Sequence, residues 1–145
     1  MPATNQAATW QDMASKLKTM GGVTSADIGE PMKGVQPGMV AIIAESGSID
    51  ETVLNAPREL HTVTLRRYED AVAKTPRERD LALDRWRAEI LEDVFGDFEL
   101  GGTIAYPLPL QCRWDYGYQT VENHIFRLLD VTVVYRVDPT ATFVA

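Results

Sequence analysis

Apolar residues recur at helical spacing near the start of the chain. Within residues 7–20, four of them follow one another at intervals of three and four: Trp10, Met13, Leu17 and Met20. Residues at these intervals share one face of an α-helix, so the pattern predicts a short amphipathic N-terminal helix. Gly21 and Gly22 come next, and glycine commonly follows the last turn of a helix.

A longer stretch with the same periodicity begins at Thr75. Thr75 suits the N-cap, Pro76 suits the first helical position, and Glu78 stands three residues after the cap, as in a capping box. The apolar stripe that follows consists of Leu83, Trp86, Ile90 and Val94, widened by Leu91 and Phe95. We therefore predict a long central helix that ends at Gly96.

Four other stretches have the patterns of β-strands. Residues 39–46 are a short apolar run, and residues 58–68 alternate between an apolar and a polar face. Residues 103–116 alternate without interruption, and residues 121–137 return after a turn that we place at residues 117–120. Each alternating stretch predicts a strand with a buried face, and the short connection makes the last two strands antiparallel neighbours.

The alternation also assigns side chains to faces. In the second predicted strand, His61, Val63 and Leu65 share one face, and Thr62, Thr64 and Arg66 share the other. In the third, the apolar face holds Ile104, Tyr106, Leu108, Leu110, Cys112, Trp114 and Tyr116. Pro107 and Pro109 remove backbone donors from one side of that strand, which indicates a free edge or a projecting end.

The remaining segments are rich in turn residues or irregular. Residues 21–38 contain five glycines and two prolines and are expected to form a loop or an arm. Residues 47–57 are expected to be irregular, and residues 138–145 to form a loose tail. A chain of 145 residues suits a single domain. The order of elements predicts an α+β fold: a two-layer structure with a mainly antiparallel sheet of about four strands, a long central helix and a short N-terminal helix.

Composition and charge exclude several classes of protein. The net charge of −7, from 21 acidic and 14 basic residues, opposes tight binding to a nucleic-acid backbone. The longest apolar run has six residues, whereas a membrane helix needs about 20, and no secretory signal is evident. A single cysteine, Cys112, rules out an intramolecular disulfide and a cysteine-based zinc site. We expect synthesis in the cytoplasm.

The sequence contains none of the common catalytic motifs. Neither a phosphate-binding glycine loop nor a nucleophile elbow occurs. His61 and His124 each lie within a predicted strand among apolar neighbours, so we expect structural or interface roles for them. Cys112 belongs to an apolar face, where a thiol behaves as a small hydrophobe. The chain is therefore expected not to be an enzyme and to need no cofactor.

An acidic cluster spans the end of the second predicted helix. It consists of Glu92, Asp93, Asp97 and Glu99. The spacing does not match a calcium-binding loop, so we expect no metal site and predict an acidic surface that faces solvent or a channel.

Arginine and aromatic residues on the predicted strands indicate protein contacts. Both types are enriched at protein interfaces, arginine because its planar guanidinium pairs with carboxylates on a neighbour. The candidate interface residues are Arg66, Arg67, Arg113, Trp114, Tyr116, Tyr118, Arg127 and Arg136. The arginines of the long helix, by contrast, are expected to be solvated: Arg77, Arg79, Arg85 and Arg87.

The layout resembles the tail terminator, or tail completion, proteins of long-tailed bacteriophages and gene transfer agents. The resemblance covers nearly the whole chain, from the short N-terminal helix through "APRELHTVTLRRY", "PRERDLALDRWRAEILEDVF" and "YPLPLQCRWDYGY" to the closing strand "FRLLDVTVVYRV". The likeness lies in the length of the chain, the order of the predicted elements and the type of residues within them. The glycine-rich segment 21–38 is longer than the family pattern.

The resemblance implies a structural role in a virion. Such a protein would form a homo-hexameric ring at the head-proximal end of the tail tube. The ring would stop growth of the tube, dock to the head-completion connector, and let DNA pass through its lumen without specific binding. The partners implied are copies of the same chain, the tail tube protein and the connector, with no membrane.

Other interpretations stay open from the sequence alone. The chain could be another neck or tail part, such as a head-closure or tube subunit, although a tube subunit should be dominated by strands. It could also be a small α+β enzyme whose site forms between subunits.

Overall fold

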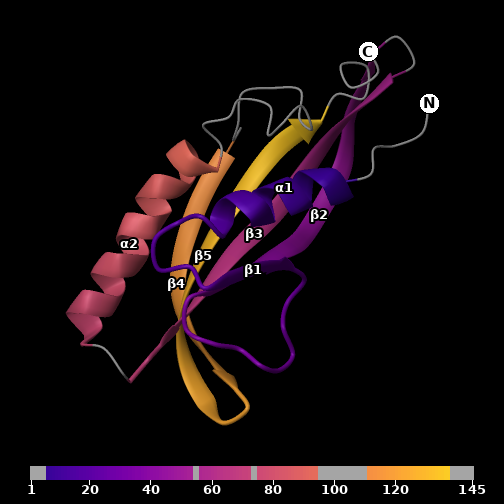
Figure 1. Ribbon diagram of the computed structural model, residues 1–145. Helices are drawn as coiled ribbons and strands as arrows, with labels where there is room; N and C mark the ends of the chain where they lie inside the picture. Colours follow the sequence, from indigo (N-terminus) through magenta and orange to yellow (C-terminus); the bar gives the residue numbers. More distant parts are fainter. Residues whose placement is uncertain (1–5, 54–55, 73–74, 95–110, 138–145) are drawn as a thin grey trace.

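The computed structural model contains a five-stranded sheet and two helices (Figure 1). It describes residues 6–53, 56–72, 75–94 and 111–137, without the side chains of 50–58, 91 and 93. The elements in chain order are α1 (Ala7–Leu17), β1 (Ser25–Ile28), β2 (Met39–Val53), β3 (Ala56–Asp70), α2 (Pro76–Asp93), β4 (Gln111–Val121) and β5 (His124–Val137). The predicted α+β class is confirmed, and the sheet has five strands, not about four.

The strands are arranged in the order β1-β2-β3-β5-β4. β1 runs parallel to β2, and the three other neighbouring pairs are antiparallel, so the sheet is mixed. β1 and β4 form its two borders. The last two strands are antiparallel neighbours, as the sequence predicted.

Three local predictions about strands were wrong. β1 lies inside the segment 21–38 that was expected to be a loop. β2 continues to Val53 through residues expected to be irregular. The prediction missed this part of the strand because bulges after Ala44 and after Ile49 interrupt the alternation of its side chains. The β4–β5 turn is at Glu122 and Asn123, with φ of 51° and 63°, and not at residues 117–120. Positive φ at both central residues is the type I′ geometry that matches strand twist.

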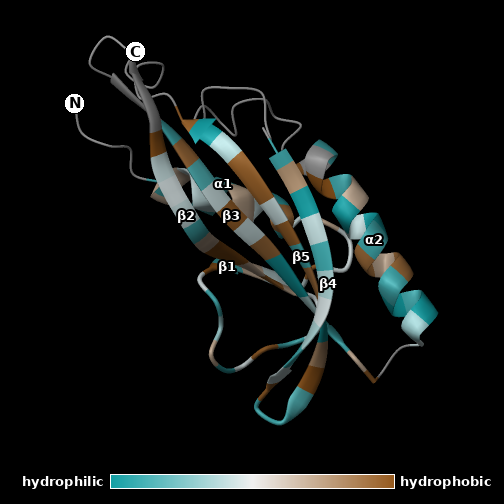
Figure 2. Cartoon of the chain, turned by 180° about the vertical axis from the view of Figure 1, so that it is seen from behind, coloured by the Kyte–Doolittle hydropathy of each residue, from teal (hydrophilic) through white to brown (hydrophobic). Residues whose placement is uncertain are grey.

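The helices begin where the sequence indicated, but α2 is not central in space. The hydroxyl of Thr75 accepts a hydrogen bond from the backbone N–H of Glu78 at 3.2 Å, as predicted for the cap. α1 ends at Leu17, earlier than Met20, and Phe95 and Gly96 lie outside the described residues. Both views place α2 alongside β4 at the border of the sheet (Figures 1 and 2), while α1 packs over β1 and β2.

Both helices bury their apolar stripes against the same face of the sheet. Leu83, Trp86 and Ile90 of α2 are at most 1% exposed and join the core with Met13 and Leu17 of α1. The strands contribute mainly Val63, Leu65, Leu129, Val131, Val133 and Tyr135. Figure 2 shows the alternation of hydrophobic and hydrophilic residues along these strands. The predicted apolar face of β3 is therefore confirmed.

The opposite face of the sheet is covered only in part. Val35, from the segment between β1 and β2, packs over Tyr68, Phe126 and Leu128. No described helix lies on this face, which explains why the second face of β5 has both apolar and polar residues. Within the described residues, no helix is long and apolar enough to cross a membrane.

The core makes a direct prediction about α2. Replacing the fully buried Leu83 by alanine should reduce the free energy of unfolding by about 2–5 kcal/mol, because it leaves a cavity between α2 and the sheet. Leu81, on the same helix, is 58% exposed, and Leu81→Ala should change it by less than about 0.5 kcal/mol. Urea unfolding followed by circular dichroism measures both. Equal losses in the two variants would contradict the packing of α2.

Candidate interaction surface

The border strand β4 exposes a row of aromatic side chains. Trp114, Tyr116 and Tyr118 point toward the helix layer but remain 45%, 39% and 60% exposed. The expectation that this face of the strand would be buried was wrong for these residues. No described strand continues the sheet beyond β4, and α2 covers the row incompletely. We refer to Trp114, Tyr116 and Tyr118 as the aromatic edge.

Arginine guanidinium groups stack on each ring of the aromatic edge. The guanidinium of Arg87 lies 4.2 Å from the ring centre of Trp114. Arg127 lies 5.3 Å from the ring of Tyr116 and 4.6 Å from that of Tyr118. Each exposed cation–π contact contributes about 0.5–1 kcal/mol. The arginines therefore hold the exposed rings in defined positions.

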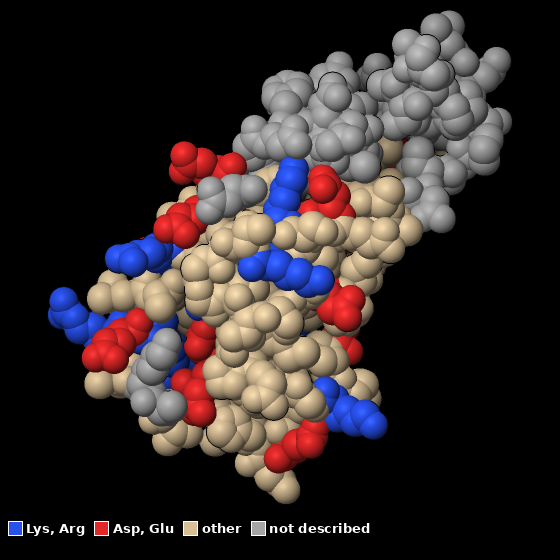
Figure 3. All heavy atoms as spheres, in the orientation of Figure 1, with Lys and Arg blue, Asp and Glu red and all other residues tan. Residues whose placement is uncertain are grey.

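Carboxylates of α2 fix these arginines in turn. Asp80 accepts hydrogen bonds at 3.2 Å from both Arg127 and Arg79. Asp84 accepts them from Arg87 at 3.0 Å and from the hydroxyl of Tyr116 at 3.3 Å. Three guanidinium groups and two carboxylates leave this border with one net positive charge. Figure 3 shows basic and acidic side chains interleaved on the α2 side of the molecule.

The ion pairs change the proton affinity of the carboxylates. Burial alone would raise the pKa of Asp80, but hydrogen bonds from Arg127 and Arg79 outweigh it and lower the pKa below its usual value. The hydrogen bond from Arg87 lowers the pKa of Asp84. Both groups are thus held in the charged form that pairs with the arginines.

The structure brings together half of the eight predicted interface residues. Trp114, Tyr116, Tyr118 and Arg127 form one continuous surface with α2. Arg113 lies on the opposite face of β4 and is exposed, and Arg136 is half-buried on that same face of β5.

The adjacent arginines of β3 point to different faces of the sheet. Arg66 is bound by Asp130 at 2.8 and 2.9 Å and by Glu30 at 2.8 Å, and the Asp130 hydrogen bond raises its pKa despite burial. Arg67 is 3% exposed, pairs with Glu69 at 2.8 Å and lies over Trp86. Its burial removes Arg67 from any surface that a neighbour could reach.

Sequence reasoning missed the contribution of α2. Arg79 and Arg87 were expected to be solvated, yet the side chain of Arg79 is only 4% exposed and that of Arg87 is half-buried against Trp114. The signal was present, because Asp80, Asp84 and Arg87 recur at intervals of four and three and so share one helix face. The sequence did not indicate, however, that this face of α2 lies against β4.

The acidic cluster is described only in part. Glu92 is exposed on the last turn of α2. The side chain of Asp93, and residues Asp97 and Glu99 entirely, lie outside the described residues. Across the described part of the chain, no group of histidine, cysteine and acidic side chains could hold a metal ion.

The two histidines make structural contacts. His61 stacks on Tyr135 and lies 2.8 Å from a carboxylate oxygen of Glu59. His124 pairs with Asp70 at 3.3 Å beside Phe126. Burial raises the pKa of the Cys112 thiol, partly offset by Arg87, which keeps it in the unreactive protonated form at neutral pH.

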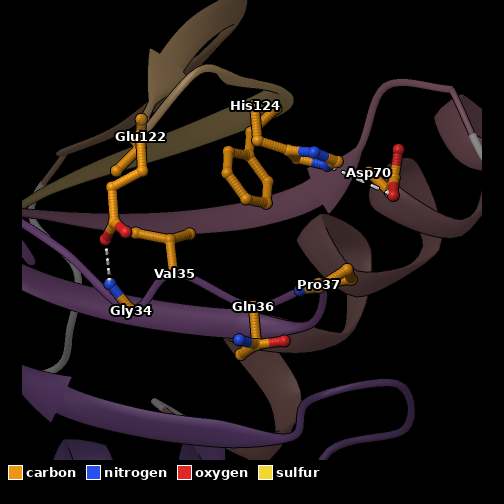
Figure 4. Close-up of a pocket in the computed structure, with 9 residues that line it drawn as sticks. Gly34, Val35, Gln36, Pro37, Asp70, Glu122 and His124 are labelled. Atoms are coloured by element: carbon orange, nitrogen blue, oxygen red, sulfur yellow. Dashed lines mark hydrogen bonds and ion pairs between the residues drawn. The ribbon is translucent and has the colours of Figure 1, made fainter.

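His124 and Asp70 line a cavity of about 370 Å³ (Figure 4). It lies between the segment that carries Val35 and the β4–β5 hairpin. Across it, the backbone N–H of Gly34 donates a hydrogen bond to Glu122 at 2.6 Å. The lining residues include no serine, threonine or cysteine. These contacts hold the hairpin against the segment. The lining residues do not include a hydroxyl or thiol nucleophile for His124 to activate.

The Asp80 ion pairs predict a pH dependence of stability. Because the pKa of Asp80 is lowered on folding, its contribution is present above the unfolded value of about 3.9 and is lost as pH falls through the lower folded value. Asp80→Asn should lower stability at pH 7 by at most about 1 kcal/mol, since the carboxylate is 40% exposed. Thermal unfolding from pH 7 to pH 2 should show the two proteins converging at the acid end.

Asp115, an exposed carboxylate on β4, provides the control. Asp115→Asn should leave the melting temperature at neutral pH close to that of the unmodified chain. A difference between Asp80→Asn and the parent that persists unchanged at pH 2 would contradict the ion-pair explanation.

Comparison with known proteins does not assign the chain to a family. No protein-family model matches the sequence, and the search of curated proteins gives no match. Any functional assignment therefore rests on the chemistry of the aromatic edge and the residues of α2 around it.

Proposed function

We propose that this protein is a structural subunit of a phage-type tail, a tail terminator that assembles into a hexameric ring. The observation that carries the proposal is the aromatic edge: three large rings left exposed at a sheet border and held in place by arginines. Tryptophan, tyrosine and arginine are the residues that most often dominate binding energy at protein interfaces. Rings already fixed by stacking lose little conformational entropy on binding.

The shape of the sheet supports a ring. A closed ring of identical subunits uses a head-to-tail interface, in which one patch of each subunit meets a different patch of the next. The two sides of this sheet differ in chemistry. β4 carries aromatic residues at one border, and on the other side the part of β2 beyond its pairing with β1 carries an acidic stretch at 45–51. A subunit with two unlike sides is suited to such an interface.

The assignment extends to partners and location as part of the same proposal. The ring sits in the virion at the head–tail junction, caps the tail tube and contacts the head-completion connector. The net charge of −7 lets DNA slide through the lumen, because a wall of like charge repels phosphate. Glu92, Asp93, Asp97 and Glu99 are the residues assigned to that acidic wall. The protein performs no reaction and requires no cofactor.

Two measurements test the assembly. Native mass spectrometry over a concentration series should show monomers and hexamers, and electron microscopy with tail tubes added should show rings at one end of each tube. A stable two-fold dimer whose melting temperature depends on a small molecule would contradict the proposal and favour an enzyme with a shared site.

The aromatic edge should control that assembly. Trp114→Ala should weaken hexamer formation by about tenfold or more, because it removes a central ring and frees Arg87. Met32→Ala changes a residue that is 89% exposed and far from this border in sequence, and it should have no effect. Thermal unfolding of each monomer separates lost assembly from lost folding. An unchanged hexamer fraction for Trp114→Ala would remove the aromatic edge from the interface.

A further inference from the structure

We infer that β4 receives the free part of β2 from a second copy of the chain as an added antiparallel strand. This inference rests on the self-association proposed above and names the two borders that meet. It follows from the backbone, the exposed side chains and the charges at the two borders.

Among the described residues, no strand pairs with the outer side of β4. The register pairs Val121 with His124 across the two-residue turn and continues to Gln111 opposite Val134. Because backbone groups alternate in direction along a strand, the odd-numbered residues of β4 bond to β5. The N–H and C=O groups of the even-numbered residues point away from the sheet: Cys112, Trp114, Tyr116, Tyr118 and Thr120. Such a row is a template for another strand.

β2 has a matching free side. β1 pairs only with residues 39–42 of β2, and the N–H of Gly29 donates to the carbonyl of Ile42 at 2.8 Å just after β1 ends. From Ile43 to Val53, no strand among the described residues lies on that side of β2. Eleven residues of β2 and the eleven of β4 therefore form free borders of equal length.

The strand directions are already correct for pairing. Three antiparallel steps separate β2 from β4, through β3 and β5. An odd number of reversals makes β2 and β4 antiparallel to each other. A second copy, placed beside the first in the same orientation, thus brings its β2 to the β4 of the first as an antiparallel neighbour. With a constant rotation between neighbouring copies, the same contact repeated closes into a head-to-tail ring.

An exposed apolar side chain on β2 fits the aromatic edge. Ile49 is 63% exposed and lies opposite Glu59, two residues from the pair Gly47 and His61. This register places Ile49 on the helix side of the sheet, which is also the side of Trp114 and Tyr116. On α2, Leu81 is exposed as well. Ile49 of the added strand can therefore pack against the aromatic rings and the flank of α2.

The charges at the two borders are complementary. Residues 45–51 of β2 contain Glu45, Asp50 and Glu51 and no lysine or arginine. The receiving border has one net positive charge from Arg79, Arg87 and Arg127 against Asp80 and Asp84, and the exposed Arg113 and Asp115 on the other face of β4 offset each other. In strand addition, main-chain hydrogen bonds supply affinity and the alternating side chains supply specificity.

Disulfide trapping tests this pairing. In a Cys112→Ser background, Ile49→Cys is combined in turn with Trp114→Cys, Tyr116→Cys and Tyr118→Cys, which samples the registers on one face. Mild oxidation should give a ladder of covalent oligomers up to six copies with at least one combination. Ser48, the neighbour of Ile49 that faces the other side of the sheet, is the control, and Ser48→Cys with the same three partners should give none.

An apolar-to-polar pair of variants provides the second measurement. Ile49→Asn should weaken self-association by about tenfold or more in sedimentation and native mass spectrometry. Ile125→Asn changes an isoleucine that is 50% exposed at the hairpin end of the same sheet face, and it should change association less than twofold. Unchanged melting of the monomers shows that folding is intact.

The outcomes separate this inference from the proposed function. Suppose that Ile49→Asn forms rings on tail tubes as well as the unmodified chain does, and that no Ile49→Cys variant cross-links. These results would overturn the strand pairing and leave the terminator role standing. Cross-linked oligomers that do not bind tail tubes would overturn the terminator role and leave the strand pairing standing. A chain that neither cross-links nor associates at any concentration would overturn the pairing.

Discussion

The packing of two helices against a single face of the sheet is the constraint on which the other features of this structure depend. Leu83, Trp86 and Ile90 are buried by the strand face that carries Val131 and Val133, and the same face receives Met13 and Leu17 from α1. The area removed from water there is the main source of stability. It also leaves the sheet with an incompletely covered second face, and no strand among the described residues extends the sheet beyond β4.

The position of α2 over one border gives β4 its chemistry. A helix centred over β3 and β5 would lie farther from Trp114 and Tyr116 and would leave their rings without partners from the helix. Because α2 lies alongside β4, its polar flank meets the rings instead, and Asp80, Asp84, Arg79 and Arg87 form a network across them. The network pairs its arginines with carboxylates of the same chain and leaves the rings partly exposed. A surface that is both ordered and incompletely buried is suited to binding another protein.

Predictions from periodicity succeeded where each residue's environment follows from its neighbours in the chain. Thr75 caps α2 because its hydroxyl reaches a backbone N–H only three residues away. They failed where a distant strand decides the outcome. β1 has only four residues and is a strand because residues 39–42 of β2 pair with it, and the bulges of β2 removed the alternation on which recognition of its second half depended.

The candidate surface divides in the same way. The sequence drew attention to Trp114, Tyr116, Tyr118 and Arg127 by residue type, and the structure places them together with α2. Arg66 and Arg67, however, look alike in the sequence and differ completely in space. Arg66 is bound to Asp130 on one face, while Arg67 is buried against Trp86 on the other.

The sequence by itself determined the α+β class, the helix starts and the apolar face of β3, because these follow from local propensity and from the periods of helix and strand. Only the tertiary structure decided which strands form the borders and which arginines remain accessible, since those properties depend on contacts between residues far apart in the chain.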